Sequence, residues 1–286
     1  MEILFLVLSV ICGSARGVFL KKINTDALNR KRFYTDLCIL FLSGGVAIFL
    51  FDVTALTSIT TITIMCAVTF GITTFVAQSC FSIALGKGPT SICSMVYSFG
   101  FIFPTILGAI CWGEDFGIFS QIGFIIALSA IIVSAFSSGK TTKSGSGFIL
   151  PNLVAMAASG GLGIIQKVHQ SSSDKQNLNA FLVLAFILAA AIALMFALFS
   201  KGGDDNKQKL SVYNVLAGLC FGMASMLNTM LAGMLPSAIM FPTLNIGVMV
   251  LSLIAGVIIF KEKPTKSQKI AFALGIVAII VLSLSK

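Results

Sequence analysis

The sequence predicts an all-α integral membrane protein with ten transmembrane helices arranged as two inverted five-helix repeats. Three observations lead to this prediction: an apolar composition, a regular succession of apolar runs, and the return of one stretch of the first half in the second half. Of the 286 residues, 57% are hydrophobic and 10% are charged, and the mean hydropathy is +1.03. Such a chain has too little polar surface to cover a soluble globule, so we expect it to lie in a bilayer.

A helix needs roughly 20 apolar residues to cross a hydrocarbon core of about 30 Å. The chain contains ten runs of suitable length, joined by short connections. The first run resembles a signal peptide, but Glu2 is its only early charge and further spans follow, so we assign it to the first transmembrane helix. The predicted spans are 3–20, 34–51, 59–85, 90–111, 120–135, 148–168, 178–199, 212–234, 237–260 and 268–284.

The stretch 81–123 returns in degraded form over 234–275. Elsewhere, GVFLK at 17–21 aligns with GIIQK at 163–167, an offset of 146, and the segment 108–114 aligns with 256–262, an offset of 148. Five helices are an odd number, so a second copy enters the membrane from the opposite side and the repeats are inverted. A linker rich in Gly, Ser, Thr and Lys, 139–147, separates a first repeat over 1–138 from a second over 148–286.

The basic residues indicate the orientation. Fifteen of the 19 Lys and Arg residues fall at the ends that hold the loops after the first, third, fifth, seventh and ninth spans. Only Lys167, Lys175 and Lys286 fall on the opposite side, and Arg16 lies within a span. Cytoplasmic loops are enriched in Lys and Arg, so we expect both termini outside. The net charge of +9 is therefore a topology signal, with some attraction to anionic lipid, and we expect no nucleic-acid partner.

Several Gly, Pro and Glu positions recur in both halves. The first copy carries Gly88-Pro89, Pro104, Gly108 and the WGE of 112–114, and the second carries Phe241-Pro242, Gly256, the FKEK of 260–263, Gln268 and Gly275. With these residues in a layout of two five-span halves, the chain resembles the EamA-type branch of the drug/metabolite transporter superfamily. The resemblance covers nearly the whole chain.

This resemblance implies a ten-helix carrier of small metabolites. In such a carrier the first, third, fourth, sixth, eighth and ninth helices surround a central cavity, and the fifth and tenth are more peripheral. Well-known members are usually drawn with both termini in the cytoplasm. The charge distribution here indicates the reverse, and we favour the charges because they are a physical count in this chain.

Arg16 is the only charge well inside a predicted span, since all ten acidic residues fall in loops or near helix ends. One interpretation is that its long side chain reaches the cytoplasmic headgroups. The other is that it contacts a carboxylate or phosphate of a substrate. Gly13 and Gly17 flank it at a spacing that lets a neighbouring helix approach closely.

Neutral polar side chains inside spans need partners, so they should face the bundle. The strongest candidates for substrate binding are Gln78, Tyr97, Asn228 and Asn245, and Gln166 is a weaker one. The alternative role for each is a hydrogen bond between helices. Two further candidates, Pro104 and Pro242, interrupt helices and are either hinges or tolerated kinks.

The sequence contains none of the common catalytic motifs that we looked for, so we do not expect an enzyme. It has no P-loop, no Gly-rich dinucleotide turn and no credible catalytic set around its single histidine, His169. The seven cysteines share no motif spacing, so we interpret them as small core residues and expect no metal and no cofactor.

We therefore predict a secondary transporter that moves a small amino-acid-like or amphipathic solute by alternating access. We expect a monomer or homodimer in the cell membrane, in bacteria the inner membrane, with the solute and membrane lipid as its partners. Two alternatives stay open. A flippase for lipid-linked sugars needs a lateral opening and an anionic headgroup site, and a non-transporting receptor or assembly protein needs a bundle packed shut. The carrier instead predicts a cavity that reaches Gln78, Tyr97 and Asn245.

Overall fold

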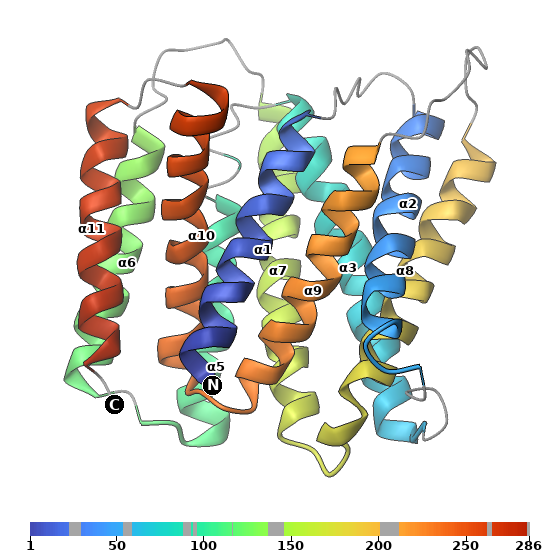
Figure 1. Cartoon of the computed structure of the whole chain (residues 1–286), viewed down its shortest axis with the longest axis horizontal. Helices are drawn as coiled ribbons and strands as arrows, with labels where there is room; N and C mark the ends of the chain where they lie inside the picture. The colour runs from blue at the N-terminus through green and yellow to red at the C-terminus, as the bar shows by residue number, and fades with distance from the viewer. Residues whose placement is uncertain are drawn as a thin grey trace.

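The computed structural model describes residues 1–22, 30–53, 59–87, 93, 96–115, 117–136, 146–200, 212–261 and 265–284. Helices make up almost all of this part of the chain, and no strand occurs in it (Figure 1). The long helices are α1 (Glu2–Lys22), α2 (Arg30–Phe49), α3 (Thr61–Lys87), α5 (Ile102–Trp112), α6 (Ile118–Phe136), α7 (Ile149–Gln170), α8 (Leu178–Phe199), α9 (Val212–Ala232), α10 (Ser237–Phe260) and α11 (Lys266–Ser283).

Most of these boundaries match the expected spans to within about two residues, and α8 and α10 match fully. The expected linker and the first part of the expected span 90–111 fall mainly outside the described residues. Of the helix before α5, Cys93 and the residues from Val96 on are described, and it joins α5 through a 3-10 turn, η2 (Phe99–Phe101).

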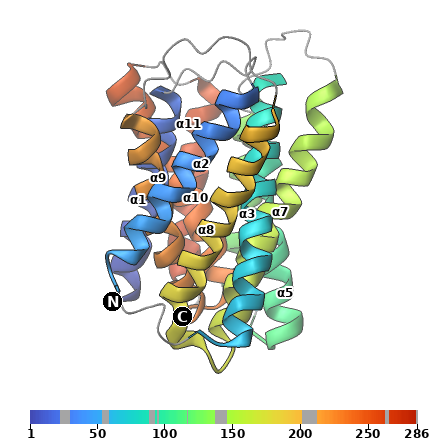
Figure 2. The ribbon, with the colours of Figure 1, turned by 90° about the vertical axis from the view of Figure 1, so that its right-hand side faces the viewer.

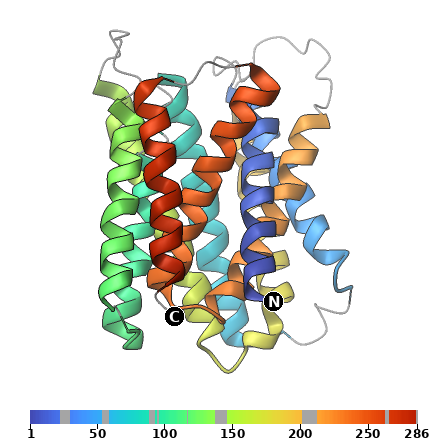
Figure 3. The same cartoon turned by 60° about the vertical axis from the view of Figure 1, so that its left-hand side comes forward.

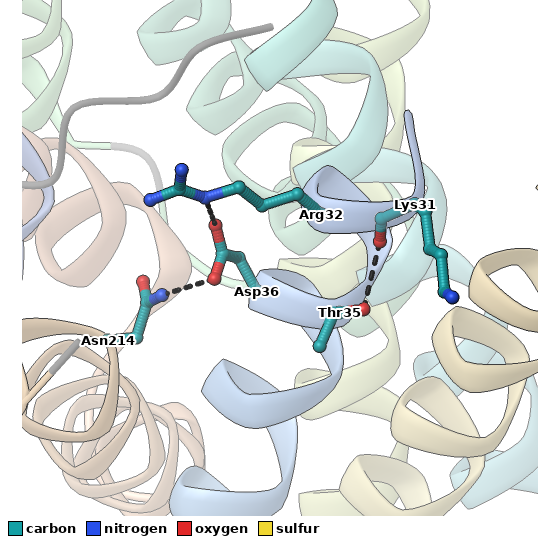
Figure 4. A network of polar contacts seen from close by, with 5 residues as sticks. All are labelled: Lys31, Arg32, Thr35, Asp36 and Asn214. Atoms are coloured by element: carbon teal, nitrogen blue, oxygen red, sulfur yellow. Dashed lines mark hydrogen bonds and ion pairs between the residues drawn. The ribbon is translucent and has the colours of Figure 1, made fainter. Parts of the chain in front are cut away.

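The expected start of the second span was wrong, because α2 begins four residues earlier, at Arg30. The basic run belongs to the first turn of the helix rather than to a loop. Arg32 lies one turn before Asp36, with Nε 4.0 Å from Oδ2, and Asp36 Oδ1 accepts a 2.8 Å hydrogen bond from Asn214 of α9 (Figure 4). The Asp36 carboxylate therefore supports a basic first turn and joins α2 to α9.

Eight helices in the described part of the chain are long and apolar enough to cross a membrane, and two shorter apolar helices lie at Val96–Trp112 and Ile118–Val133. Large apolar side chains are exposed all along the outside of the bundle, among them Ile3, Ile110, Leu150 and Ile258. An apolar exterior on apolar helices suits contact with lipid. The protein is thus a multi-pass membrane protein.

The helices pack in a repeating pattern of pairs. α2 lies against α8 and α6 lies against α11, and these two pairs form opposite edges of the molecule (Figures 1–3). Between the edges, α1 packs on α9 and α10, while α7 packs on α3 and α5. The two chain ends lie at the same end of the bundle (Figure 1).

Small residues allow the closest crossings. A Cβ placed on Gly222 of α9 would lie 2.2 Å from the carbonyl oxygen of Gly44 in α2, so only glycine fits there. A Cβ on Gly13 of α1 would lie 2.8 Å from Val248 of α10, and one on Gly247 would lie 2.7 Å from Val10. The close approach expected beside Arg16 is confirmed at Gly13.

The helices α5 and α10 end in the same way. Gly113 follows α5 with φ +60° and Lys261 follows α10 with φ +53°, both in the left-handed region. The backbone N–H that closes each cap bonds to the carbonyl of Gly108 in the first case and of Gly256 in the second. These positions are 148 residues apart in both comparisons, which is the offset found in the sequence.

Candidate functional site

Arg16 extends from α1 into the bundle, between helices of both halves of the chain. Its Nη2 donates a hydrogen bond to Oε1 of Gln78 in α3, and its Cζ lies 4.0 Å from the ring centroid of Phe221 in α9. Its Nε is buried and has no hydrogen-bond partner. The side chain therefore points toward α3 and α9, and part of its surface stays exposed.

Gln78 connects Arg16 to Tyr97. An arginine only donates, so the amide of Gln78 must turn its oxygen toward Arg16 and its nitrogen toward Tyr97. Nε2 of Gln78 then donates to Oη of Tyr97 at 3.4 Å. The tyrosine oxygen accepts this bond and keeps its own O–H to donate elsewhere. The ring of Tyr97 packs on Phe81, with the two centroids 4.4 Å apart.

The local backbone around Tyr97 is shaped by Pro104. A proline has no N–H for the carbonyl four residues earlier, here Gly100, and the helix tightens into η2 just before it. This segment packs closely on α7, because a Cβ on Gly100 would lie 2.7 Å from the carbonyl oxygen of Met156. Ser159 of α7 donates to the carbonyl of Tyr97 at 3.1 Å, which holds the tyrosine in place.

The other expected site residues lie apart from this cluster and have separate partners. Asn228 of α9 accepts a 2.5 Å hydrogen bond from Ser9 of α1. Gln166 of α7 is buried and donates to the carbonyl of Ser225 at 3.4 Å. Asn245 bonds to the carbonyl of Phe241 in its own helix, next to Pro242. Of the expected site residues, the structure thus brings together Arg16, Gln78 and Tyr97.

A second polar group lies near the end of the bundle that holds the two termini. Lys167 of α7 and Glu114, just after α5, form a largely buried ion pair. Lys167 also donates to the carbonyl of Leu235 at 3.3 Å, and the other oxygen of Glu114 accepts the backbone N–H of Ser237 at 2.6 Å. Glu114 thereby holds the start of α10, since Ser237 is the first residue of that helix.

The sequence did not single out Phe221, Phe81 or Lys167. The two phenylalanines are among 25 in the chain, and hydropathy does not separate them from lipid-facing ones. Lys167 carried a signal, because it ends a segment repeated from the first half. The motif residues Gly88-Pro89 and the residues Glu262 and Lys263 lie outside the described part of the chain.

The charge of Arg16 is only partly compensated. Taking an ion out of water costs several kcal/mol, whereas a cation over an aromatic face recovers about 0.5–2 kcal/mol. Within the described residues, no carboxylate lies within ion-pair distance of Arg16. The same part of the chain holds no group of three or more His, Cys, Asp or Glu side chains suited to a metal ion. The cluster around Arg16 is therefore suited to binding a hydrogen-bond acceptor.

Comparison with solved structures gives the class of fold. In that comparison 27 chains match, and one of them, titled "Crystal structure of protein", covers 99% of this chain and 96% of its own length with a TM-score of 0.77. The two sequences are 15% identical, so this likeness concerns the fold alone. A sequence comparison with curated proteins found no match.

Comparison with family models is more specific. The model of the EamA-like transporter family matches residues 147–284. This half of the chain belongs to that family, and the resemblance expected from the repeated Gly, Pro and Glu positions is confirmed there. This match supports a membrane transporter of the drug/metabolite superfamily.

Proposed function

We propose that the protein is a secondary carrier that moves a small amino-acid-like or amphipathic metabolite by alternating access. The moving parts are two inverted five-helix units, 1–138 and 148–286, joined by the linker 139–147. The EamA-like family match over residues 147–284 supports the transport function. The pairing of the helices is the observation that carries the mechanism.

The main helix contacts are kept when the helices of one half are exchanged for those of the other, whereas the contacts of α10 with α11 and α6 have no comparable counterpart at α5 among the described residues. Replacing α1, α2, α3, α5 and α6 by α7, α8, α9, α10 and α11 turns the contact of α1 with α9 into that of α7 with α3. It turns the contact of α2 with α9 into that of α8 with α3, and it leaves the α2–α8 and α6–α11 pairs as they are. This exchange, with the matching caps at Gly113 and Lys261, supports two related units facing each other.

All the polar candidates lie on the helices between the two edge pairs (Figure 1). These helices are α1, α3, α7, α9, α10, and α5 together with the segment that precedes it. We place the substrate beside Arg16, Gln78 and Tyr97. Asn228, Asn245 and Gln166 are secondary contacts that exchange their present partners for substrate during the cycle. The two prolines, Pro104 and Pro242, are the hinges of this motion, because each leaves a carbonyl of its helix without the usual partner.

The orientation follows from the basic residues. The end of the bundle with both termini carries few of them, so we place that end outside the cell membrane. The ion pair of Lys167 and Glu114 then belongs to the outer side. A tag at either terminus, accessible to an impermeant reagent on intact cells, is the expected result, and protection of both termini would reverse the orientation.

Transport is tested with purified protein in lipid vesicles. Uptake and efflux of a panel of labelled metabolites are compared with those of protein-free vesicles, with and without a pH gradient. We expect at least one small solute to cross only in the presence of the protein. Acceleration by a pH gradient would identify proton coupling, and its absence would indicate exchange or facilitated diffusion. A correctly folded protein that inserts into the vesicles yet moves no solute contradicts the proposal.

A further inference from the structure

The cluster around Arg16 has an excess of hydrogen-bond donors. A guanidinium offers five N–H donors and accepts nothing. One bond goes to Gln78, while Nε is buried without a partner. Because the amide of Gln78 is oriented by Arg16, Tyr97 receives a bond and its own O–H has no acceptor among the described residues. What is missing at this place is a hydrogen-bond acceptor, and the local charge is positive.

The remaining walls of the cluster are aromatic. Phe221 covers one face of the guanidinium, and Phe81 packs on the ring of Tyr97. Aromatic side chains contact apolar groups and leave the charged edge of the guanidinium free to bind in the plane. The same small region therefore presents a cationic fork next to apolar surface.

We propose that Arg16 and Tyr97 bind the carboxylate or phosphate of a small organic anion whose apolar or aromatic part lies on Phe221 and Phe81. This inference rests on the proposed carrier function and names its class of substrate. Gln78 is a positioning residue, since it orients Arg16 and Tyr97. The asymmetry of the site fits a polar head and an apolar body, because the residue aligned with Arg16 in the second half is Leu162.

A native cysteine allows a test that needs no knowledge of the substrate. Cys220 is partly exposed and directly precedes Phe221, the residue of α9 whose ring lies against the guanidinium of Arg16. In a variant that keeps Cys220 as its single cysteine, we compare modification by a negatively charged sulfonatoethyl and a positively charged trimethylammonium-ethyl methanethiosulfonate. Rates are divided by those for a free thiol, so that only the effect of the site remains.

With Arg16 present, we expect the normalised rate to be higher for the negative reagent than for the positive one, because a positive charge nearby attracts the sulfonate. The ratio of the two rates should fall by roughly tenfold in Arg16→Gln. It should be kept in Arg16→Lys, which retains the charge. A charge preference of the same size with Arg16 present and in Arg16→Gln would overturn the inference. So would failure of both reagents to react with the folded protein, which would mean that the guanidinium is sealed inside the bundle.

A second measurement keeps Arg16 intact and tests the ligand class. Phenylpyruvate and phenyl phosphate are added as probes during modification of Cys220, with benzamide as the neutral control. We expect either anion, but not benzamide, to slow the modification of Cys220. The anion that slows it more shows whether the site prefers a carboxylate or a phosphate. Equal protection by benzamide, or no protection by either anion, contradicts the assignment. Labelling of Cys220 does not depend on transport. If the protein moves no solute in vesicles but anions still protect Cys220, the carrier function is contradicted and the anion site is not.

Discussion

Lys167 and Glu114 form an ion pair across the two halves of the chain, with only 11% and 13% of their side chains exposed. Each partner also binds the turn that leads into α10, through the carbonyl of Leu235 and the N–H of Ser237. Three segments, the end of α5, α7 and the start of α10, are therefore tied together at the end of the bundle that holds the termini.

Removing one member of this pair should destabilise the protein more than removing both charges. Lys167→Ala leaves the carboxylate of Glu114 buried and unpaired, and we expect a loss of about 3–5 kcal/mol in the free energy of unfolding. The double variant Lys167→Met with Glu114→Gln avoids that buried charge and should be more stable than the single one. Unfolding in mixed detergent micelles measures both, and a single variant as stable as the double one would show that the pair is not buried.

The hydrogen bond of Ser9 with Asn228 should hold α1 on α9. Ser9→Ala leaves the amide of Asn228 without its partner, and bonds of this kind between membrane helices contribute about 0.6–1.7 kcal/mol. Ser129→Ala is the control, because the hydroxyl of Ser129 bonds to the carbonyl of Ile125 in its own helix. A double-mutant cycle of Ser9 and Asn228 measures the coupling energy of the two side chains. A value near zero would mean that this hydrogen bond does not stabilise the packing of α1 on α9.

Gly222 should tolerate no larger side chain. Gly222→Ala places a methyl group where the carbonyl oxygen of Gly44 lies 2.2 Å away, so α2 and α9 must move apart. Overpacking of this kind costs about 1–3 kcal/mol. In the control, Gly117→Ala, the added Cβ meets nothing within 4 Å. Thermal unfolding in detergent compares the two variants, and equal stability would mean that the crossing is looser than described.

The two left-handed caps should respond in opposite ways. Gly113→Ala forces a residue with a Cβ into φ +60°, which we expect to cost about 1 kcal/mol, since no neighbour interferes. Lys261 already has this strain at φ +53°, so Lys261→Gly should stabilise the protein by a similar amount. Melting temperatures of the two variants should therefore move in opposite directions, and a shift of the same sign would contradict the shared geometry.

Much of the fold was predictable, because apolar runs and their repetition are encoded locally. The ends of α8 and α10 followed from where apolar residues stop. The start of α2 did not follow from hydropathy, because its first turn is basic. The pair of Arg32 and Asp36 is local, but the bond of Asp36 with Asn214 of α9 is a contact that no local pattern contains. The proposed division into units rests on the same repetition.

The candidate site was predictable only as a list of polar residues inside spans. Which of them meet depends on helix rotation and crossing, which close contacts such as Gly13 with Val248 decide. Arg16 joins Gln78 and Tyr97, whereas Asn228 and Gln166 bond to other helices, and hydropathy does not distinguish these cases. Phe221 completes the cluster from the second half of the chain, out of 25 phenylalanines with similar surroundings in the sequence.

Alternating access is tested most directly by asking from which side Cys220 is reached. The protein with Cys220 as its single cysteine is placed in sealed vesicles, and an impermeant charged thiol reagent is added outside or trapped inside. We predict modification from both sides, although the vesicles stay impermeable to the same reagent. Modification from one side only, or from neither, would contradict a carrier that opens its central site to each face in turn.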